Sequence, residues 1–428
     1  MVSASLPLAE WTKRSDLAAL LAALGPGNAR YVGGAVRDTL LGIAVKDIDI
    51  ATPLEPDAVI KRLKAHNIQV VPTGIAHGTV TALLGGGPVE ITTLRHDVST
   101  DGRRATVAFA QDWQEDAARR DVTINALYAD PITGEIWDYF GGLEDLNARR
   151  VRFIGEARER IREDHLRILR YFRFQARFGS QPADNASEIA CAELAATLKG
   201  LSRERVGMEV ITLLGLPDPA PTVARMAQLG VLQVVLPEAD VAALAALVDK
   251  EARQDVVPDP IRRLAALLPA DGPLAEQVAA RFRLSGAQKK RLALAAGRFL
   301  ESPPLGEVAS RSDDGGGLPA DQPPPSGASA PATSPKGGDS GAARALAYYL
   351  GLTAAIDRLL LTGQTIAPLT GWTAPTFPLK GGQIVARGVK AGPDVARILK
   401  AVEAQWVTEG FPGEARIQAI LGKLLSPS

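Results

Sequence analysis

The spacing of apolar and polar residues changes once along the chain, near residue 155. Strict alternation places successive side chains on opposite faces of a strand, whereas apolar residues three or four apart share one face of a helix. Before residue 155 both patterns occur in short runs. They predict strands at 30–32, 47–52, 69–72, 78–84, 89–95 and 136–139, and helices at 15–24, 57–66 and 112–129.

After residue 155 the strand pattern stops, and from Ile161 onward apolar residues recur with helical spacing between glycine and proline breaks. Such breaks end helices, so this part predicts an all-α region. The expected fold class is α+β: a mixed sheet with helices, followed by helices alone. We predict a head at 1–150, a neck at 151–215, a helical body at 216–301 and a helical tail at 343–428, with tail helices at 343–361 and 393–407.

One segment departs from both patterns. From Ser302 to Gly341 the residues are mostly Pro, Gly, Ser, Ala and Asp, and no apolar period is present. Such a composition buries too little apolar surface to offset the entropy lost on folding. We therefore expect a disordered linker or insertion at 302–342. A phosphorylated or partner-binding segment is the alternative, although no recognisable ligand pattern repeats in it.

Composition fits a folded protein of several domains. The chain has 428 residues, of which 46% are hydrophobic. It contains no run of about eighteen apolar residues, as a membrane span needs, and no N-terminal signal pattern. The single cysteine, Cys191, excludes an internal disulfide and a thiolate metal cluster and agrees with a reducing compartment. We expect a cytoplasmic protein in which Cys191 is a small buried residue.

Charge is balanced overall but not locally. The chain has 48 Lys and Arg against 48 Asp and Glu, so net charge alone does not indicate a nucleic-acid partner. Between Arg149 and Phe178, however, ten arginines face four acidic residues. Guanidinium groups match phosphate oxygens in geometry and charge. This stretch is therefore a candidate surface for a polyphosphate or an RNA backbone.

Two aspartates, Asp47 and Asp49, lie two residues apart in a predicted strand. Residues at this spacing project from the same face, and paired carboxylates favour Mg²⁺. Alone, an Asp-x-Asp is common at solvated strand ends. Glu90, on the neighbouring predicted strand, is a candidate third carboxylate of the site, or else a plain edge-strand charge.

A glycine pair precedes the aspartates. Gly33 and Gly34 stand between a predicted strand and a helix, where exposed backbone N–H groups can approach a triphosphate and Arg37 can bind it. A tight turn is the simpler explanation of a glycine pair. A phosphate seat shortly before a metal-binding strand is more specific than either feature alone, because phosphoryl transfer needs mainly positioning and charge neutralisation.

The arginine-rich stretch is predicted to be one helix over 161–178. Ile161, Ile168, Leu169, Phe172 and Ala176 fall on one arc, with Tyr171, Phe174 and Phe178 among the charged residues of the other. Asp164 and Arg167 are three residues apart and are predicted to lie side by side. A fixed acceptor and donor of this kind can read the edge of a base.

Five ordered stretches resemble the motifs of the class II tRNA nucleotidyltransferase and bacterial poly(A) polymerase family. The resemblance implies a polymerase-β-type nucleotidyltransferase head followed by helical neck, body and tail. It implies addition of C, C and A to the 3′ end of tRNA, with CTP and ATP as substrates and release of pyrophosphate. The stretches are Gly33–Asp38, Asp47–Asp49, Arg119–Ala126, Glu163–Arg170 and Glu204–Glu209.

The resemblance also assigns roles. It implies that Asp47 and Asp49 hold Mg²⁺ as catalytic residues. It implies that Asp164 and Arg167 pair with the incoming base, and that residues 98–107 form a flexible loop used in switching from C to A. The further residues implied to bind nucleotide are Gly33, Gly34, Arg37, Arg120, Asp121, Asn125, Arg170 and Arg173.

Some features depart from the family pattern. Gln383 stands where an acidic residue is frequent, and Ala396 where a glycine is. The resemblance therefore covers the tail less closely than the head. The chain has four histidines, which we interpret as ordinary polar residues, so a fused metal phosphohydrolase domain is not expected.

Three different activities remain open at the sequence level. They are alternatives to CCA addition: poly(A) tailing with ATP alone, RNA binding without catalysis, and transfer of nucleotides to a small molecule or a protein. The aspartate pair argues against an inactive protein, and the arginine-rich stretch favours an RNA acceptor. The sequence implies neither a membrane nor a stable protein partner.

Overall fold

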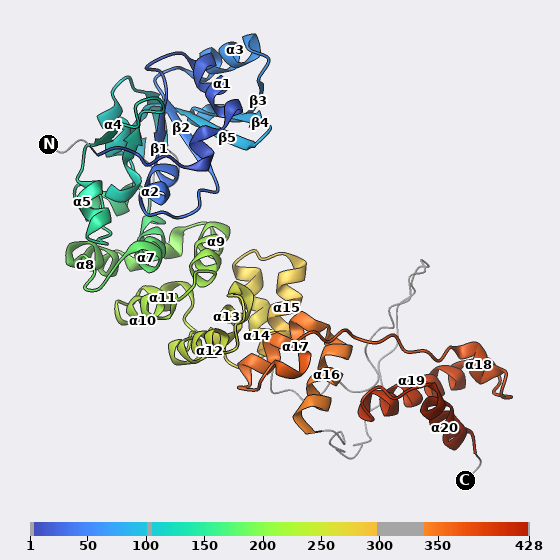
Figure 1. Ribbon diagram of the computed structural model, residues 1–428. Coiled ribbons are helices and arrows are strands. Elements are labelled where there is room, and N and C mark those ends of the chain that lie inside the picture. The colour runs from blue at the N-terminus through green and yellow to red at the C-terminus, as the bar shows by residue number, and fades with distance from the viewer. Residues whose placement is uncertain (1–3, 101–104, 298–337, 427–428) are drawn as a thin grey trace. The chain divides into compact units, whose positions relative to one another are not determined.

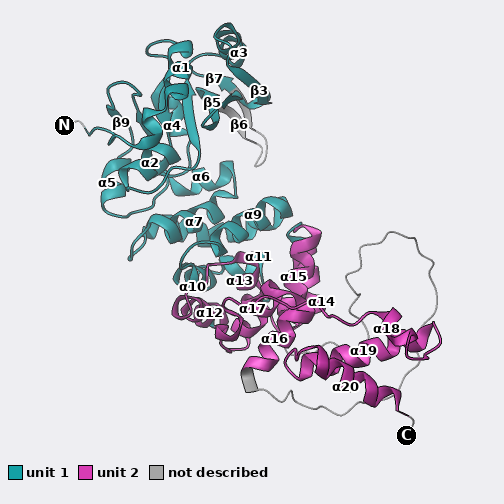
Figure 2. Cartoon of the chain, turned by 45° about the vertical axis from the view of Figure 1, so that its right-hand side comes forward, with its two compact units in different colours: residues 1–242, 281–283 teal, residues 243–280, 284–428 magenta. Residues whose placement is uncertain are grey.

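The computed structural model describes residues 4–100, 105–297 and 338–426. The chain forms two compact units, coloured separately in Figure 2. Unit 1 contains residues 1–242 and 281–283, and unit 2 contains residues 243–280 and 284–428. The finer division into head, neck, body and tail stays a prediction.

Seven strands of unit 1 form one sheet in the order β3-β4-β5-β2-β1-β8-β9. Strands β1 to β5 are labelled in Figure 1. β2 and β5 are parallel, and the other neighbours are antiparallel. The mixed sheet predicted for the head is confirmed. The strands are β1 (Arg30–Val32), β2 (Ile48–Thr52), β3 (Gln69–Gly74), β4 (Thr79–Leu84), β5 (Gly87–Thr93), β8 (Leu127–Ala129) and β9 (Ile136–Asp138).

The alternation in β2 gives the sheet two different faces. Ile48 and Ile50 are buried and point to one side, whereas Asp49 and Ala51 point to the other. Helices α1 (Ser15–Leu24) and α3 (Pro56–Ala65) pack against each other, and α3 lies against β3 and β4. Helix α3 thus covers part of the sheet, and Asp49 lies on the face opposite to Ile48 and Ile50.

The face that carries Asp49 has its own apolar cluster, which includes Val32, Ala51 and Tyr128. Trp113, from helix α4 (Trp113–Ala118), packs against this cluster together with Trp137. Aromatic packing therefore fixes α4 over this face of the sheet, close to β1 and β2.

The helix predicted over 112–129 is wrong. The structure has α4, a 3-10 helix over Thr123–Asn125, and then strand β8, which pairs with β1 and β9. Val122, Thr123 and Ile124 are β-branched, and their side chains disfavour a helix. Residues 127–129 form a strand because their backbone pairs on one side with β1, which lies far away in the sequence, and on the other side with β9.

Strands β6 (Arg95–Thr100) and β7 (Ala105–Phe109) form a separate antiparallel pair that the sequence analysis did not predict. The loop predicted at 98–107 falls on the ends of these strands and on residues 101–104, which lie outside the described residues. Helix α2 (Gly34–Leu40) follows β1, and α5 (Gly142–Asn147) follows β9.

The rest of unit 1 is helical, as predicted. The single helix predicted over 161–178 is wrong, because α6 ends at Glu163 and α7 begins at Arg167. Asp164 has an extended conformation, and its carboxylate accepts the Leu166 N–H at 3.1 Å. The elements are α6 (Ala157–Glu163), α7 (Arg167–Phe178), α8 (Asn185–Glu193), a 3-10 helix (Ala195–Gly200), α9 (Arg203–Leu214), α10 (Ala220–Gln228) and α11 (Val231–Val235).

Unit 2 consists of helices over its described residues. The helix predicted over 343–361 is two helices, separated at Gly351, whose φ of 84° ends the first. Among the helices of the described segments, none is long and apolar enough to cross a membrane. The helices are α12 (Val241–Arg253), α13 (Pro260–Leu267), α14 (Gly272–Arg281), α15 (Gly286–Ala296), α16 (Gly338–Leu350), α17 (Leu352–Leu361), α18 (Gly381–Val385), α19 (Pro393–Thr408) and α20 (Glu414–Leu425).

The expected linker at 302–342 lies outside the described residues up to residue 337, and its last residues belong to α16.

Candidate functional site

An acid pair lies on the polar face of the sheet. Asp49 and Glu90 are register partners in the parallel pair β2–β5, so their side chains leave the same face. Asp47 is exposed and directly precedes β2. Burial raises the pKa of Asp49, the negative charges of Glu90 and Asp47 raise it further, and Arg120 acts to lower it. The three carboxylates therefore interact through their charges.

This charge arrangement fits a divalent cation. Within the described residues, no three acidic, histidine or cysteine side chains are placed to hold a metal ion by themselves. Mg²⁺ takes one or two carboxylates and completes its shell with water and phosphate oxygens. An acid pair whose negative charge is incompletely balanced thus matches an ion that arrives together with a phosphate ligand. Glu90 faces the same region, but its role as a ligand stays a prediction.

The glycine turn lies beside the acid pair, because β1 and β2 are neighbours. Gly33 has φ 68° and ψ −121°, which a residue with a side chain rarely adopts. A Cβ at Gly33 would lie 3.4 Å from Nη1 of Arg120. The turn therefore brings bare backbone close to a guanidinium group, and the sequence prediction of Gly33 and Gly34 between a strand and a helix is confirmed.

Arg37 of α2 is buried rather than open to solvent. Its Nε donates to Asp38 at 2.8 Å, and its Nη1 donates to Asn125. The guanidinium carbon lies 4.0 Å from the centre of the Phe178 ring. Burial lowers the pKa of Arg37, whereas Asp38 acts to raise it. These contacts hold the side chain in one place at the end of the glycine turn.

Arg120 is held from two sides. Its Nε donates to the Tyr128 hydroxyl at 3.1 Å, and its Nη2 donates to Asp116 at 3.2 Å. Burial would raise the pKa of Asp116, but the charges of Arg120 and Arg119 outweigh it and lower the pKa to about 2. The sequence analysis missed Asp116 and Tyr128, since an acidic residue in a helix and a strand tyrosine carry no distinctive local signal.

Asp121 connects the head to α7. Its Oδ1 accepts from Asn125 at 3.1 Å, and its Oδ2 accepts from Arg170 Nε at 2.8 Å. Arg173, one turn further along α7, donates to Glu209 of α9 at 2.6 Å. Two predicted nucleotide-binding residues, Asp121 and Asn125, therefore contact each other, and Arg170 joins them from a distant part of the sequence.

Asp164 and Arg167 do not share a helix face as predicted, because Asp164 lies outside both helices, and their side chains have different partners. Asp164 accepts from Arg205 at 2.6 Å. Arg167 donates to Glu163 at 2.6 Å and to the main-chain oxygen of Arg119 at 2.9 Å. The break between α6 and α7 causes this difference, because Asp164 lies outside both helices.

The aromatic residues of α7 face inward. Tyr171, Phe174 and Phe178 are all buried, although the helical wheel placed them among the charged residues. Arg173 lies over the Phe174 ring at 4.4 Å. The arginines of α7 thus use aromatic faces as supports, which orients their guanidinium groups.

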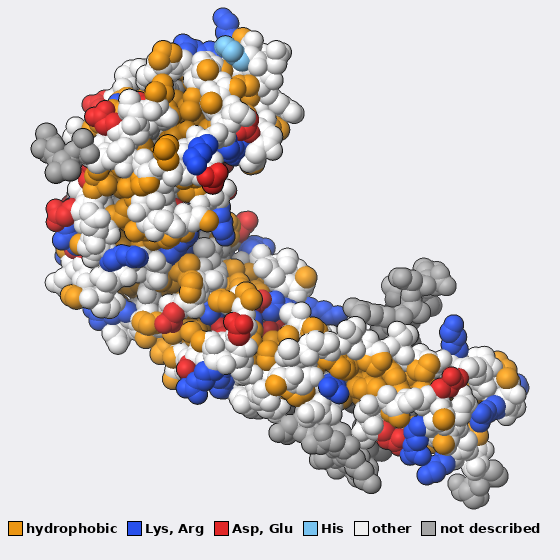
Figure 3. All heavy atoms as spheres, viewed as in Figure 1, with side chains coloured by type: hydrophobic (Ala, Val, Ile, Leu, Met, Phe, Trp, Pro, Cys, Tyr) orange, Lys and Arg blue, Asp and Glu red, His pale blue; other side chains and the backbone are white. Residues whose placement is uncertain are grey.

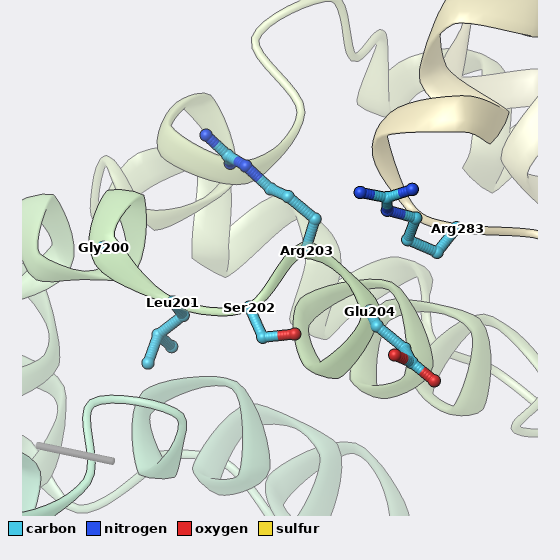
Figure 4. Close-up of a pocket in the computed structure, with 6 residues that line it drawn as sticks. All are labelled: Gly200, Leu201, Ser202, Arg203, Glu204 and Arg283. Carbon is cyan, nitrogen blue, oxygen red and sulfur yellow. The ribbon is translucent and has the colours of Figure 1, made fainter.

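A hollow of about 620 Å³ opens at the start of α9 (Figure 4). Arg203 and Arg283 are exposed and come from different segments, and the Arg203 and Glu204 side chains point to opposite sides. None of the residues lining this hollow belongs to β2 or β5. On the face shown in Figure 3, basic and acidic side chains occur on both units, in keeping with the zero net charge.

Two protein families match the chain. Residues 29–152 match the family described as Poly A polymerase head domain. Residues 184–242 match the family described as probable RNA and SrmB-binding site of polymerase A. All the site residues on β1, β2, β5 and the 119–126 stretch lie within the first match.

Curated relatives are similar over the same part. The chain is 48% identical over 188 residues to the mitochondrial CCA tRNA nucleotidyltransferase 1 of Homo sapiens, which covers 43% of each chain. It is 41% identical over 188 residues to the CCA-adding enzyme of Latilactobacillus sakei, covering 44% of this chain and 46% of the relative. The chain thus aligns with less than half the length of these relatives.

Solved structures share the fold more widely. The crystal structure of Bacillus stearothermophilus CCA-adding enzyme in complex with CTP has a TM-score of 0.65 at 23% identity, covering 96% of this chain and 97% of the other. A tRNA nucleotidyltransferase complexed with a primer tRNA and an incoming ATP analog has a TM-score of 0.52 at 26% identity, covering 62% and 79%. The predicted fold, a nucleotidyltransferase head followed by helices, is confirmed.

Residues 29–152 and 184–242 of this chain are therefore similar in sequence to domains of polymerase A, and the chain as a whole shares the fold of the solved CCA-adding enzyme.

Proposed function

We propose that the protein adds C, C and A to the 3′ end of tRNA, using CTP and ATP and releasing pyrophosphate. The observation that supports this most directly is the juxtaposition of the Asp49–Glu90 acid pair with the Gly33 turn and Arg120. Negative groups for a cation and positive groups for phosphates lie on one face of one sheet. The relatives named for CCA addition match over this same region.

In the proposed reaction, Asp47 and Asp49 would hold a divalent cation, for which we propose Mg²⁺. Such an ion supplies charge neutralisation on the phosphates and lowers the pKa of the 3′-hydroxyl. The chain's own groups do the binding and orientation. Arg120 Nη1, at the rim of the glycine turn, would donate to a phosphate oxygen, and the N–H groups after Gly33 would approach the triphosphate.

The remaining predicted residues would surround the nucleotide. Asn125 binds Arg37 and Asp121, and Asp121 binds Arg170, and this chain of contacts supports our proposal that Asp121 and Asn125 contact the ribose. Asp164 and Arg167 would contact the base edge, although they are fixed by separate partners. Base choice would then depend on how Arg205 and Glu163 hold these two side chains, and not on a shared helix face.

The test follows the product of the reaction. Purified protein is incubated with tRNA that lacks its terminal CCA, with CTP, ATP or both, and the product is sequenced. We expect growth that stops after three nucleotides and requires CTP. Long tracts of A made from ATP alone would instead identify a poly(A) polymerase. Labelled nucleotide on a small molecule or a protein would identify an enzyme with that acceptor, and tRNA binding without any product would identify an inactive RNA-binding protein.

The cytoplasmic location stays a prediction, since a matched relative is named as mitochondrial.

A further inference from the structure

One buried carboxylate outside the predicted site binds four groups. Asp116 of α4 has no exposed surface. Its Oδ2 accepts from the Tyr128 hydroxyl at 2.6 Å and from Arg120 Nη2 at 3.2 Å. Its Oδ1 accepts from Arg119 Nε at 2.8 Å and from the Arg95 N–H at 3.3 Å. A carboxylate taken out of water is costly unless its oxygens are bonded, and here both oxygens are.

Among the contacts described, Arg120 uses two of its three guanidinium nitrogens to donate hydrogen bonds. The Tyr128 hydroxyl binds Nε, and Asp116 binds Nη2. The third nitrogen, Nη1, lies against the Gly33 turn, and the guanidinium charge acts on Asp49. Because a guanidinium group is planar, fixing two of its nitrogens fixes the direction of the third.

The same carboxylate reaches two other parts of the head. Asp116 accepts a hydrogen bond from the side chain of Arg119. The main-chain oxygen of Arg119 in turn accepts a hydrogen bond from Arg167 Nη2 at 2.9 Å. Arg95, whose N–H it accepts, is the first residue of β6. Asp116 therefore contacts Arg120 beside the Gly33 turn, Arg119, whose main chain binds Arg167, and the first residue of β6.

We propose that Asp116 is a positioning residue for nucleotide binding. It holds Arg120 with Nη1 aimed at the triphosphate seat, and it fixes the 119–120 backbone against which Arg167 is oriented. This inference rests on the proposed function, since it assigns the seat to a nucleoside triphosphate. Asp116 itself does not touch the reacting atoms.

The experiment compares two variants at this network with one matched control. Asp116→Asn keeps the shape but removes the charge, and Tyr128→Phe removes only the hydroxyl shared by Asp116 and Arg120. Glu188→Gln is the control, because Glu188 is also buried and binds Arg225 of α10, away from the phosphate seat. Each full-length variant is assayed for KM and kcat with CTP and ATP, for the Kd of ATP by calorimetry, and for thermal unfolding.

We expect Asp116→Asn to raise KM and Kd for both nucleotides about tenfold or more, since a charge-assisted contact to phosphate is misdirected. Tyr128→Phe should raise them by about threefold to tenfold. Glu188→Gln should lower the unfolding temperature and leave both constants unchanged. Equal losses of thermal stability in all three, with unchanged nucleotide constants, would show that Asp116 is only structural and overturn the proposal.

If Asp116→Asn does not fold, Tyr128→Phe carries the test alone, and an unchanged Kd in that variant refutes the proposal. If the wild-type protein adds nothing to tRNA, the proposed function fails, but calorimetry with ATP still decides the role of Asp116. Tighter binding by wild type than by Tyr128→Phe supports that role, and equal or absent binding opposes it.

Discussion

Asp49, which we propose binds a cation, shows how a buried carboxyl next to other acidic groups costs stability. Its pKa is raised by burial and by the charges of Glu90 and Asp47, so the folded state disfavours the ionised form. A carboxyl whose folded pKa exceeds its unfolded value is destabilising above the folded pKa. That penalty fades as the pH falls toward the unfolded value, about 3.9.

Asp49→Asn should therefore unfold at a higher temperature than wild type at pH 7 without divalent cation, and the gain should shrink as the pH approaches 4. The same variant should lose nucleotide incorporation by about a hundredfold or more while tRNA binding remains. Calorimetric melts across pH, with a primer-extension assay, test both. Retained turnover, or a lower melting temperature at pH 7, would contradict this account of the acid pair.

The Asp121–Arg170 contact behaves in the opposite way. Burial would raise the pKa of Asp121, but the charge of Arg170 and the hydrogen bond from Asn125 hold it below its usual range. Its stabilising contribution is present above the unfolded pKa of about 3.9 and is lost as the pH falls further. Asp121→Ala should thus lower the free energy of unfolding at pH 7.

We expect that loss to be about 2 kcal/mol, less than for a fully buried pair, because water reaches part of Arg170. Denaturant titration at pH 7 measures it. Arg170→Ala offers the reciprocal comparison, and a double variant gives the coupling between the two side chains. Independent, additive effects would show that the contact contributes nothing to folding.

At the scale of elements, the sequence predicted those whose pattern is local and missed those set by distant partners. The strand over 48–52 and the helix over 15–24 follow from their own spacing. The helix predicted over 112–129 failed because residues 127–129 enter the sheet between β1 and β9. The prediction of one arginine-rich helix failed for a different reason, since the extended backbone at Asp164 separates α6 from α7.

The α6–α7 break gives Arg167 its direction. Arg167 begins α7 and is held by Glu163, at the end of α6, and by the backbone of Arg119. Arg167→Ala should therefore alter the choice between C and A more than the rate of transfer. Competition between CTP and ATP on tRNA ending in CC measures that choice. An unchanged ratio with a slower rate would remove Arg167 from base recognition.

Helix α9 contains a glycine that packing requires. A Cβ at Gly207 would lie 2.5 Å from the Phe282 main-chain oxygen. Replacing a helical glycine with alanine ordinarily stabilises by about 0.5–1 kcal/mol, but an enforced clash with backbone costs about 1–3 kcal/mol. Gly207→Ala should therefore be destabilising.

Gly422 of α20 is the matched control, because nothing lies within 4 Å of a Cβ there. Gly422→Ala should be neutral or stabilising by about 0.5–1 kcal/mol. Denaturant unfolding of each variant checks the pair of signs. A Gly207→Ala protein as stable as wild type would show that α9 can move away from Phe282 without cost.

At the scale of the molecule, the order of motifs indicated a head with a nucleotide site, but not how the site is assembled. Asp49 and Glu90 become neighbours only through the parallel register of β2 and β5. Asp116 has no motif of its own, and its role follows from Tyr128 and Arg120 folding onto it. Contacts of this kind depend on sheet order, which local spacing does not determine.

Unit 2 also depends on contacts between residues far apart in the sequence, which lie before and after residues 298–337. Arg291 of α15 binds Asp357 of α17 through two hydrogen bonds, of 2.7 and 3.0 Å, and also pairs with Asp259 at 2.9 Å. Helices on either side of the stretch along the chain are thus joined directly. Their association does not require the connection to be long.

Deleting residues 310–330 should consequently leave folding and activity near those of wild type. Halving the length of a connecting segment changes the entropic cost of closing it by about 0.6 kcal/mol, which is small beside a buried ion pair. Denaturant unfolding and the tRNA extension assay, run on the deletion and on Asp357→Asn, separate the two contributions. We expect Asp357→Asn to be the more destabilised protein, since it leaves Arg291 and the buried Arg262 short of a charge partner. A deletion that unfolds the protein while Asp357→Asn remains stable would mean that the stretch itself holds unit 2 together.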